Sequence, residues 1–161
     1  MPDNLLDERR LVSRILRHWQ EMAIGRNLPS KDNIDPWLVG DDWSYCTLIT
    51  LDTVLSKSIF LTVGANLLPA GMPSLNFKPI SECPAGTILA VTLAELERAI
   101  STRGPLCIAS GARHLDIPVM FRAILLPLSN DGSQIDSIFG AANFRPLAVN
   151  ENAAPHKVTA G

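Results

Sequence analysis

The chain has 161 residues, of which 47% are hydrophobic and 19% are charged, and its net charge is −2 at neutral pH. This length fits one domain, and this composition can supply a buried core. The charge balance gives no basic footprint for nucleic acid, and no apolar run reaches the roughly 18 residues of a membrane span. The polar, mixed-charge N-terminus lacks the pattern of a signal peptide, so we expect a cytoplasmic protein.

Three cysteines, Cys46, Cys83 and Cys107, are widely spaced and form no C-x-x-C pair. This spacing predicts neither a disulfide framework nor a metal site. The sequence also lacks H-E-x-x-H, a Walker glycine loop and G-x-G-x-x-G. We therefore expect no metal, no cofactor and no catalysis. A thiol-dependent enzyme that uses Cys83 or His114 is a remote alternative, and it would need an acid or a base beside Cys83.

The first predicted element is an amphipathic helix over residues 4–24. Its apolar side chains recur at three- and four-residue steps and form one stripe: Leu11, Val12, Ile15, Leu16, Trp19, Met22 and Ala23. Two interpretations of this stripe stay open. It packs against its own domain, or it contacts a second copy of the protein through Leu11, Ile15, Trp19 and Met22.

Residues 26–42 are predicted to be irregular, with one short helical turn that Asp35 caps and Pro36 begins. Strands are predicted at 43–51 and 58–63. Their near-continuous apolar character favours a sheet that is covered on both faces.

Four prolines and three glycines in residues 64–86 leave room only for short helical turns. A helix is predicted over residues 92–103, with Thr92 and Glu95 as a capping box. The next predicted strand covers residues 106–113.

The last two predicted strands, at 117–128 and 134–145, flank Asp131 and Gly132. Asp-Gly tolerates the positive φ of a tight turn, so this stretch predicts a long antiparallel hairpin. Residues 147–161 show no periodicity and are expected to be a disordered tail.

Four motifs add detail to this order of elements. They are His18-Trp-Gln-Glu, the segment 25–36 that ends in Asp-Pro, Val63-Gly64, and the segment 124–141 with its Leu-Pro-Leu and Asp-Gly pieces. With them the chain resembles a bacterial family of compact single-domain PAS-like proteins, over about residues 8–146. The resemblance implies an α+β fold: a five-stranded antiparallel sheet with helices on one face and an extra N-terminal helix on the other.

One segment departs from that family. The second strand usually runs into a helical segment that roofs the PAS cavity. Here residues 65–77 contain prolines that shorten any helix. This departure puts the shape of any ligand pocket in doubt.

The resemblance implies a non-catalytic signalling or adaptor module that works through protein–protein contacts. The expected partners are a second copy, bound through the N-terminal helix, and an unknown signalling protein. The alternative is a sensor that binds a small apolar or amphipathic ligand inside the PAS cavity. The candidate lining residues are Leu96, Ile100, Val119, Phe121, Ala123 and Leu125. The same residues could make an ordinary dry core, and strand parity does not decide which face of 134–145 points inward.

Overall fold

The computed structural model describes residues 3–147 and 157–160, with side chains described for residues 10–147. Its centre is one antiparallel sheet with the strand order β2-β1-β5-β4-β3-β6. The strands are β1 (Cys46–Thr50), β2 (Ile59–Val63), β3 (Leu106–His114), β4 (Ile117–Leu128), β5 (Ser137–Pro146) and β6 (Lys157–Ala160). All five predicted strands occur, which confirms the α+β class with an antiparallel sheet, and β6 is an additional strand.

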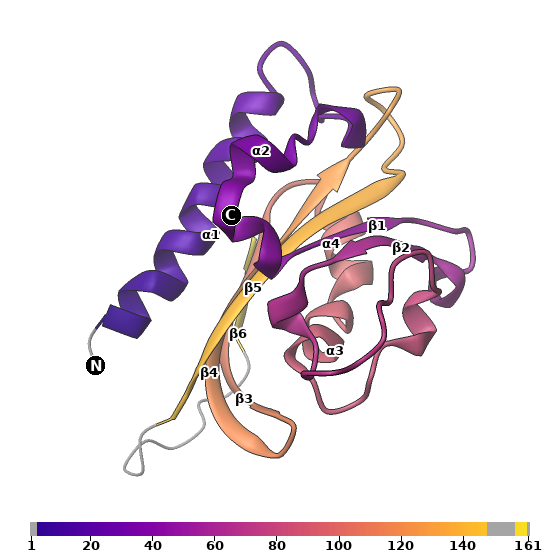
Figure 1. Cartoon of the computed structure of the whole chain (residues 1–161). Coiled ribbons are helices and arrows are strands. Elements are labelled where there is room, and N and C mark those ends of the chain that lie inside the picture. Colours follow the sequence, from indigo (N-terminus) through magenta and orange to yellow (C-terminus); the bar gives the residue numbers. More distant parts are fainter. Residues whose placement is uncertain (1–2, 148–156, 161) are drawn as a thin grey trace.

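Helices cover both faces of this sheet (Figure 1). The helix α1 (Asp3–Met22) packs on β4 and β5, while α3 (Ile88–Leu93) and α4 (Leu96–Thr102) pack on the other side. A short helix, α2 (Pro36–Val39), follows α1. The remaining 3-10 turns are η1 (Lys31–Asn33), η2 (Gly40–Tyr45), η3 (Leu55–Lys57), η4 (Ala65–Leu67) and η5 (Ile80–Glu82). Among the described residues, no helix has both the length and the apolarity to cross a bilayer.

The predicted hairpin of β4 and β5 is confirmed. Gly132 has a φ of 79°, as the tight turn requires. The Asp131 carboxylate accepts hydrogen bonds from the amides of Gln134 at 2.9 Å and Ser133 at 2.8 Å. Because these bonds stabilise the charged form, they lower the pKa of Asp131. The Asp131 carboxylate therefore stabilises the turn by hydrogen bonds to two amides of the same turn.

The register of this hairpin decides which side chains share a face. Phe121 lies opposite Phe144, and Leu125 lies opposite Gly140. The Phe144 ring is 4.4 Å from the His114 ring, whose Nδ1 accepts the first amide of α3, from Ile88, at 3.0 Å. This face therefore points towards α3 and α4, which settles the question that strand parity left open.

The apolar stripe of α1 is buried against its own sheet. Leu11 and Ile15 are each 1% exposed, and Trp19 is 8% exposed. The Trp19 indole donates a hydrogen bond of 2.9 Å to the Pro127 carbonyl oxygen of β4. The first interpretation of the stripe, packing within its own domain, is thus confirmed.

The predicted start of the helix at residue 92 is wrong. Thr87 caps α3 instead, accepting a hydrogen bond of 3.1 Å from the Ala90 amide. Thr92 lies inside α3 and is 2% exposed, and its hydroxyl donates 2.8 Å to the Ile88 carbonyl oxygen. The Thr-x-x-Glu pattern misled the prediction because a threonine hydroxyl can also bond backward within a helix.

The expectation of a disordered tail is wrong for residues 157–160. These residues form β6, which pairs with β3 from Leu106 to Ala109. The rest of the predicted tail, residues 148–156 and 161, lies outside the described residues. The edge of β3 offers unpaired backbone groups that a further strand can satisfy, and local periodicity does not report this.

Candidate functional site

The six candidate cavity residues do come together between the sheet and α4. They nevertheless enclose no usable space. Phe121, Ala123 and Leu125 are 0% exposed, Leu96 is 1% and Val119 is 2% exposed, and Ile100 is half-buried. A side chain without accessible surface has no room beside it for even a water molecule. Their burial favours the dry-core interpretation over the ligand cavity.

Packing around Gly140 supports the same conclusion. A Cβ added there would lie 3.1 Å from Leu125 Cδ2 and 3.1 Å from Thr47 Cγ2. The neighbouring side chains already fill the space above the glycine. The core between the sheet and the helices α3 and α4 is therefore closely packed at this point.

The four candidate interface residues of α1 are also used within the chain. Leu11, Ile15 and Trp19 are buried, and Met22 is half-buried against the core. Within the single chain these side chains contact the domain's own sheet, so the stripe keeps little accessible surface for a second copy. The amphipathic pattern reports that one face is buried, but it does not say against which partner.

The contacts described for the Cys83 thiol include neither an acid nor a base. The Cys83 sulfur lies 3.8 Å from the Pro84 carbonyl oxygen and 3.9 Å from the Thr87 hydroxyl, and neither group is a base. Partial burial raises the pKa of the Cys83 thiol, so the reactive thiolate is disfavoured at neutral pH. Burial also raises the pKa values of Cys46 and Cys107.

His114, the other residue of the thiol hypothesis, has a structural role. Its Nδ1 accepts the Ile88 amide at the start of α3, and its ring packs on Phe144. Removal from water lowers the pKa of this imidazole. Within the described residues, no group of three or more His, Cys, Asp or Glu side chains could hold a metal ion.

The surface around α2 has features that the sequence analysis did not select. Asp35 begins the helix as predicted, since its carboxylate accepts the Trp37 amide at 2.9 Å. Pro36 occupies the first turn, and Gly40, with a φ of 67°, ends the helix after four residues. This short turn leaves Trp37 92% exposed and Leu38 75% exposed.

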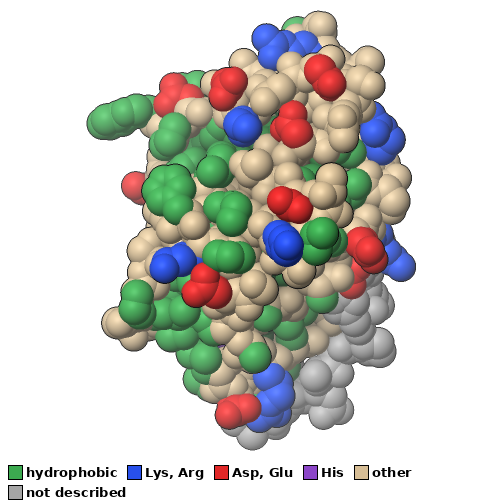
Figure 2. All heavy atoms as spheres, turned by 90° about the vertical axis from the view of Figure 1, so that its right-hand side faces the viewer, with side chains coloured by type: hydrophobic (Ala, Val, Ile, Leu, Met, Phe, Trp, Pro, Cys, Tyr) green, Lys and Arg blue, Asp and Glu red, His purple; other side chains and the backbone are tan. Residues whose placement is uncertain are grey.

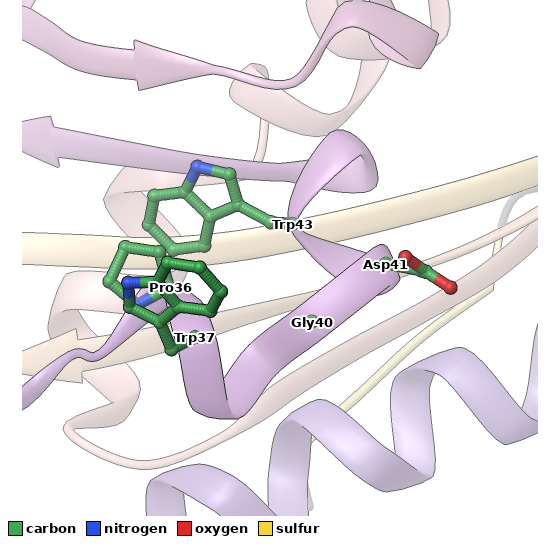
Figure 3. Close-up of a pocket in the computed structure, with 5 residues that line it drawn as sticks. All are labelled: Pro36, Trp37, Gly40, Asp41 and Trp43. Atoms are coloured by element: carbon green, nitrogen blue, oxygen red, sulfur yellow. The ribbon is translucent and has the colours of Figure 1, made fainter.

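An open pocket of about 300 Å³ lies beside this turn. We call it the tryptophan pocket, and its lining residues are Pro36, Trp37, Gly40, Asp41 and Trp43. The rings of Pro36, Trp37 and Trp43 gather on one side of the turn, and Asp41 points away at the other end (Figure 3). Trp43 is half-buried, and its ring centroid is 6.3 Å from that of Phe139 in β5.

The tryptophan pocket is held against α1 by an ion pair. Arg14 donates from Nε and Nη2 to the two oxygens of Asp42, at 2.6 Å and 2.8 Å. Such a two-pronged contact fixes orientation as well as distance. The segment 31–43 contains four aspartates and one lysine, so this surface remains acidic after Arg14 has paired with Asp42.

A second open pocket, of about 360 Å³, lies in the proline-containing loop that follows β2. Its lining is mostly apolar and comes almost entirely from that loop: Val63, Ala65, Leu68, Pro69, Ala70, Gly71, Met72 and Ser74. No charged side chain lines it. A pocket of this kind lacks the polar groups that would orient a specific ligand.

Charges of both signs are interspersed with hydrophobic side chains on the molecular face that carries β1, β2 and α3 (Figure 2). A nucleic-acid surface needs a continuous basic patch. This face does not offer one, which agrees with the net charge of −2.

No family model matches the chain, and no curated protein matches its sequence.

We take the tryptophan pocket as the candidate functional site, because it combines an open hollow with the strongly exposed ring of Trp37. Sequence reasoning missed it because α2 is too short for a periodic pattern. One signal was present: two tryptophans, Trp37 and Trp43, lie within seven residues of a segment rich in turn-forming residues.

Proposed function

We propose that this protein is a cytoplasmic, PAS-like, non-catalytic signalling or adaptor module that docks another protein through the tryptophan pocket and Leu38. The order of the elements supports the PAS-like part of the proposal. One antiparallel sheet carries α1 on one face and α3 and α4 on the other, as the resemblance implies.

The exposure of Trp37 is the observation that carries the docking role. Tryptophan is highly buried on average in proteins, whereas this side chain is 92% exposed and has Leu38, at 75%, beside it. Exposed tryptophans are among the residues that most often dominate the binding energy of protein interfaces. Helices already cover both faces of the sheet over β4 and β5, so these strands do not offer a free apolar face.

The partner that we propose is a different protein chain. The sensor alternative has less support, because its candidate cavity residues are packed in a dry core. A contact between two copies through the stripe of α1 is disfavoured because Leu11, Ile15 and Trp19 are buried.

Photo-crosslinking in the protein's own host tests this function. Leu38 is replaced by p-benzoylphenylalanine, and the same substitution at Phe77 is the matched control, because Phe77 is also 75% exposed but lies outside the pocket. We expect one discrete heavier adduct from position 38 and none from position 77. Mass spectrometry then identifies the second chain. Equal adducts at both positions, no adduct at position 38, or an adduct with a second copy would each overturn the proposal.

A further inference from the structure

Building on the function proposed above, we propose that the tryptophan pocket binds an arginine side chain of the partner protein. The pocket combines two indole rings with an acidic surrounding. Neither feature alone would select one side chain, but together they match the two properties of a guanidinium group, its flat face and its charge.

The indole of Trp37 supplies a stacking surface. At 92% exposure the ring leaves most of its area open to a partner. Arginine lies over the face of tryptophan more often than lysine does, within about 6 Å of the ring centre. The ring of Trp43 is fixed by its contact with Phe139, with centroids 6.3 Å apart, so the second wall of the pocket is already in place before binding.

Aspartates supply the complementary charge. Asp41 lines the end of the pocket opposite the rings, and its exposed carboxylate points away from them, so it attracts a cation through its charge at longer range (Figure 3). Asp35 lies at the start of α2, where one of its oxygens accepts the Trp37 amide. Asp42 is excluded from this role because Arg14 already occupies both of its oxygens. Lysine would satisfy the charge but not the flat ring surface, which is why we assign arginine.

A nuclear magnetic resonance titration tests this assignment. The probe is an acetylated hexapeptide of alternating proline and arginine, and its control is the same peptide with citrulline, which keeps the shape of arginine but has no charge. The chain has three tryptophans, and each gives one indole N–H signal. We expect the Trp37 and Trp43 signals to move with the arginine peptide. The Trp19 signal should stay fixed, because its N–H is bonded to Pro127 inside the chain.

Affinity differences give the quantitative part of the test. An exposed stacking contact of this kind corresponds to roughly a two- to fivefold change in affinity. We expect the citrulline peptide and the variant Trp37→Ala each to bind about fivefold more weakly than the original pair. Asp41→Asn should also weaken binding, and the effect should shrink at high salt.

Two matched variants control for general effects. Phe77→Ala removes an equally accessible aromatic ring outside the pocket, and Glu97→Gln removes an exposed acid on α4. Both should leave the affinity unchanged. Because Trp37 and Asp41 are exposed, their variants should fold normally, which the unshifted Trp19 signal reports.

Several results would overturn the arginine assignment: equal binding of the citrulline peptide, unmoved Trp37 and Trp43 signals, or the same loss in Phe77→Ala as in Trp37→Ala. The crosslinking and titration results together distinguish a failure of the arginine assignment from a failure of the docking function. A crosslink at position 38 together with an unresponsive pocket would leave docking intact and remove only arginine. A responsive pocket without any crosslink would retain arginine binding and remove the docking function.

Discussion

At the scale of single residues, Gly64 is held in a place that a larger side chain cannot occupy. Its amide donates 2.7 Å to the Cys46 carbonyl oxygen, which brings its backbone against residues 44–45. A Cβ on Gly64 would overlap the Ser44 carbonyl group and lie 2.9 Å from the Tyr45 nitrogen. The obstacle is backbone, so it cannot move aside as a flexible side chain would.

Gly64→Ala should therefore lower the free energy of unfolding by about 3 kcal/mol. Gly104→Ala is the matched control, because the nearest atom to its added Cβ, the Thr102 carbonyl oxygen, is 4.0 Å away. The control should stay within about 1 kcal/mol of the original chain. Urea unfolding followed by circular dichroism measures both, and equal stability of the two variants would contradict the predicted overlap.

His114 should make stability depend on pH. Removal from water lowers its pKa in the folded chain below the 6.5 of the unfolded chain. Between these two values the unfolded state binds more protons, so stability rises with pH. The contribution is fully present above pH 6.5 and is lost as pH falls through the folded pKa.

His114→Asn tests this dependence. The asparagine oxygen can still accept the Ile88 amide but does not titrate between pH 5 and 7. Loss of the ring contact with Phe144 lowers the stability of the variant at every pH. The test is the slope of the free energy of unfolding against pH. When urea unfolding is repeated between pH 5 and 7, this slope should be flatter in the variant than in the original chain. An unchanged slope would contradict the role of His114.

At the scale of elements, Trp19 ties α1 to β4. Trp19→Ala should cost about 3–5 kcal/mol, because a large buried side chain is removed. Trp19→Phe keeps a ring but leaves the Pro127 carbonyl oxygen without its indole donor, which should cost about 1–3 kcal/mol. Urea unfolding gives both values. A fully stable Trp19→Ala variant that loses self-association in sedimentation would instead restore the dimer interpretation of α1.

The strand β6 protects one edge of the sheet. It pairs with residues 106–109 of β3, whose other side is bonded to β4. The double variant Val158→Pro, Thr159→Pro keeps the chain length but removes the amide donors of these two residues. Hydrogen exchange of the peptide that covers residues 106–109 should become faster in this variant. The peptide that covers β5 is the internal control, and unchanged exchange in β3 would contradict the pairing.

Elements defined by neighbours in the sequence were predictable. The repeat of α1, the Asp35–Pro36 start of α2 and the Asp131–Gly132 turn each depend on residues within about one helical turn or one hairpin loop. The sequence analysis could therefore place them within a few residues.

Features made by distant segments were not predictable. Gly64 is constrained by Ser44, α3 is anchored through Ile88 and His114, and β6 pairs with a strand about 50 residues earlier. The tryptophan pocket belongs to the same class, since Trp43, its second wall, contacts Phe139 of β5, which is far away in the sequence. No local pattern contains these partners.

At the scale of the whole molecule, helices cover both faces of the sheet over β4 and β5, and the core on the α3 and α4 side is closely packed. Some large apolar side chains remain exposed, among them Trp37 and Leu38 in the short helix α2. This packing disfavours an internal ligand, and the exposed side chains of α2 are the basis of the docking function proposed above.

Because the core is closely packed, we expect the intact protein to carry no bound organic ligand. Native mass spectrometry of the chain purified from its own host should give the mass of the polypeptide without a stoichiometric organic ligand. Phe121, Ala123 and Leu125 are 0% exposed, so no retained molecule can lie against them without displacing side chains. An added mass that disappears on denaturation would contradict this and revive the sensor function.

The matched control for that experiment is a variant with an artificial cavity, and benzene is its test ligand. Leu125→Ala should cost about 2–5 kcal/mol and leave a small apolar cavity beside Gly140. Such cavities stay dry and bind small apolar molecules, so benzene should raise the melting temperature of this variant. The original chain, which has no space at this position, should not respond to benzene. A stabilisation as large in the original chain as in Leu125→Ala would mean that the core can open to admit a ligand.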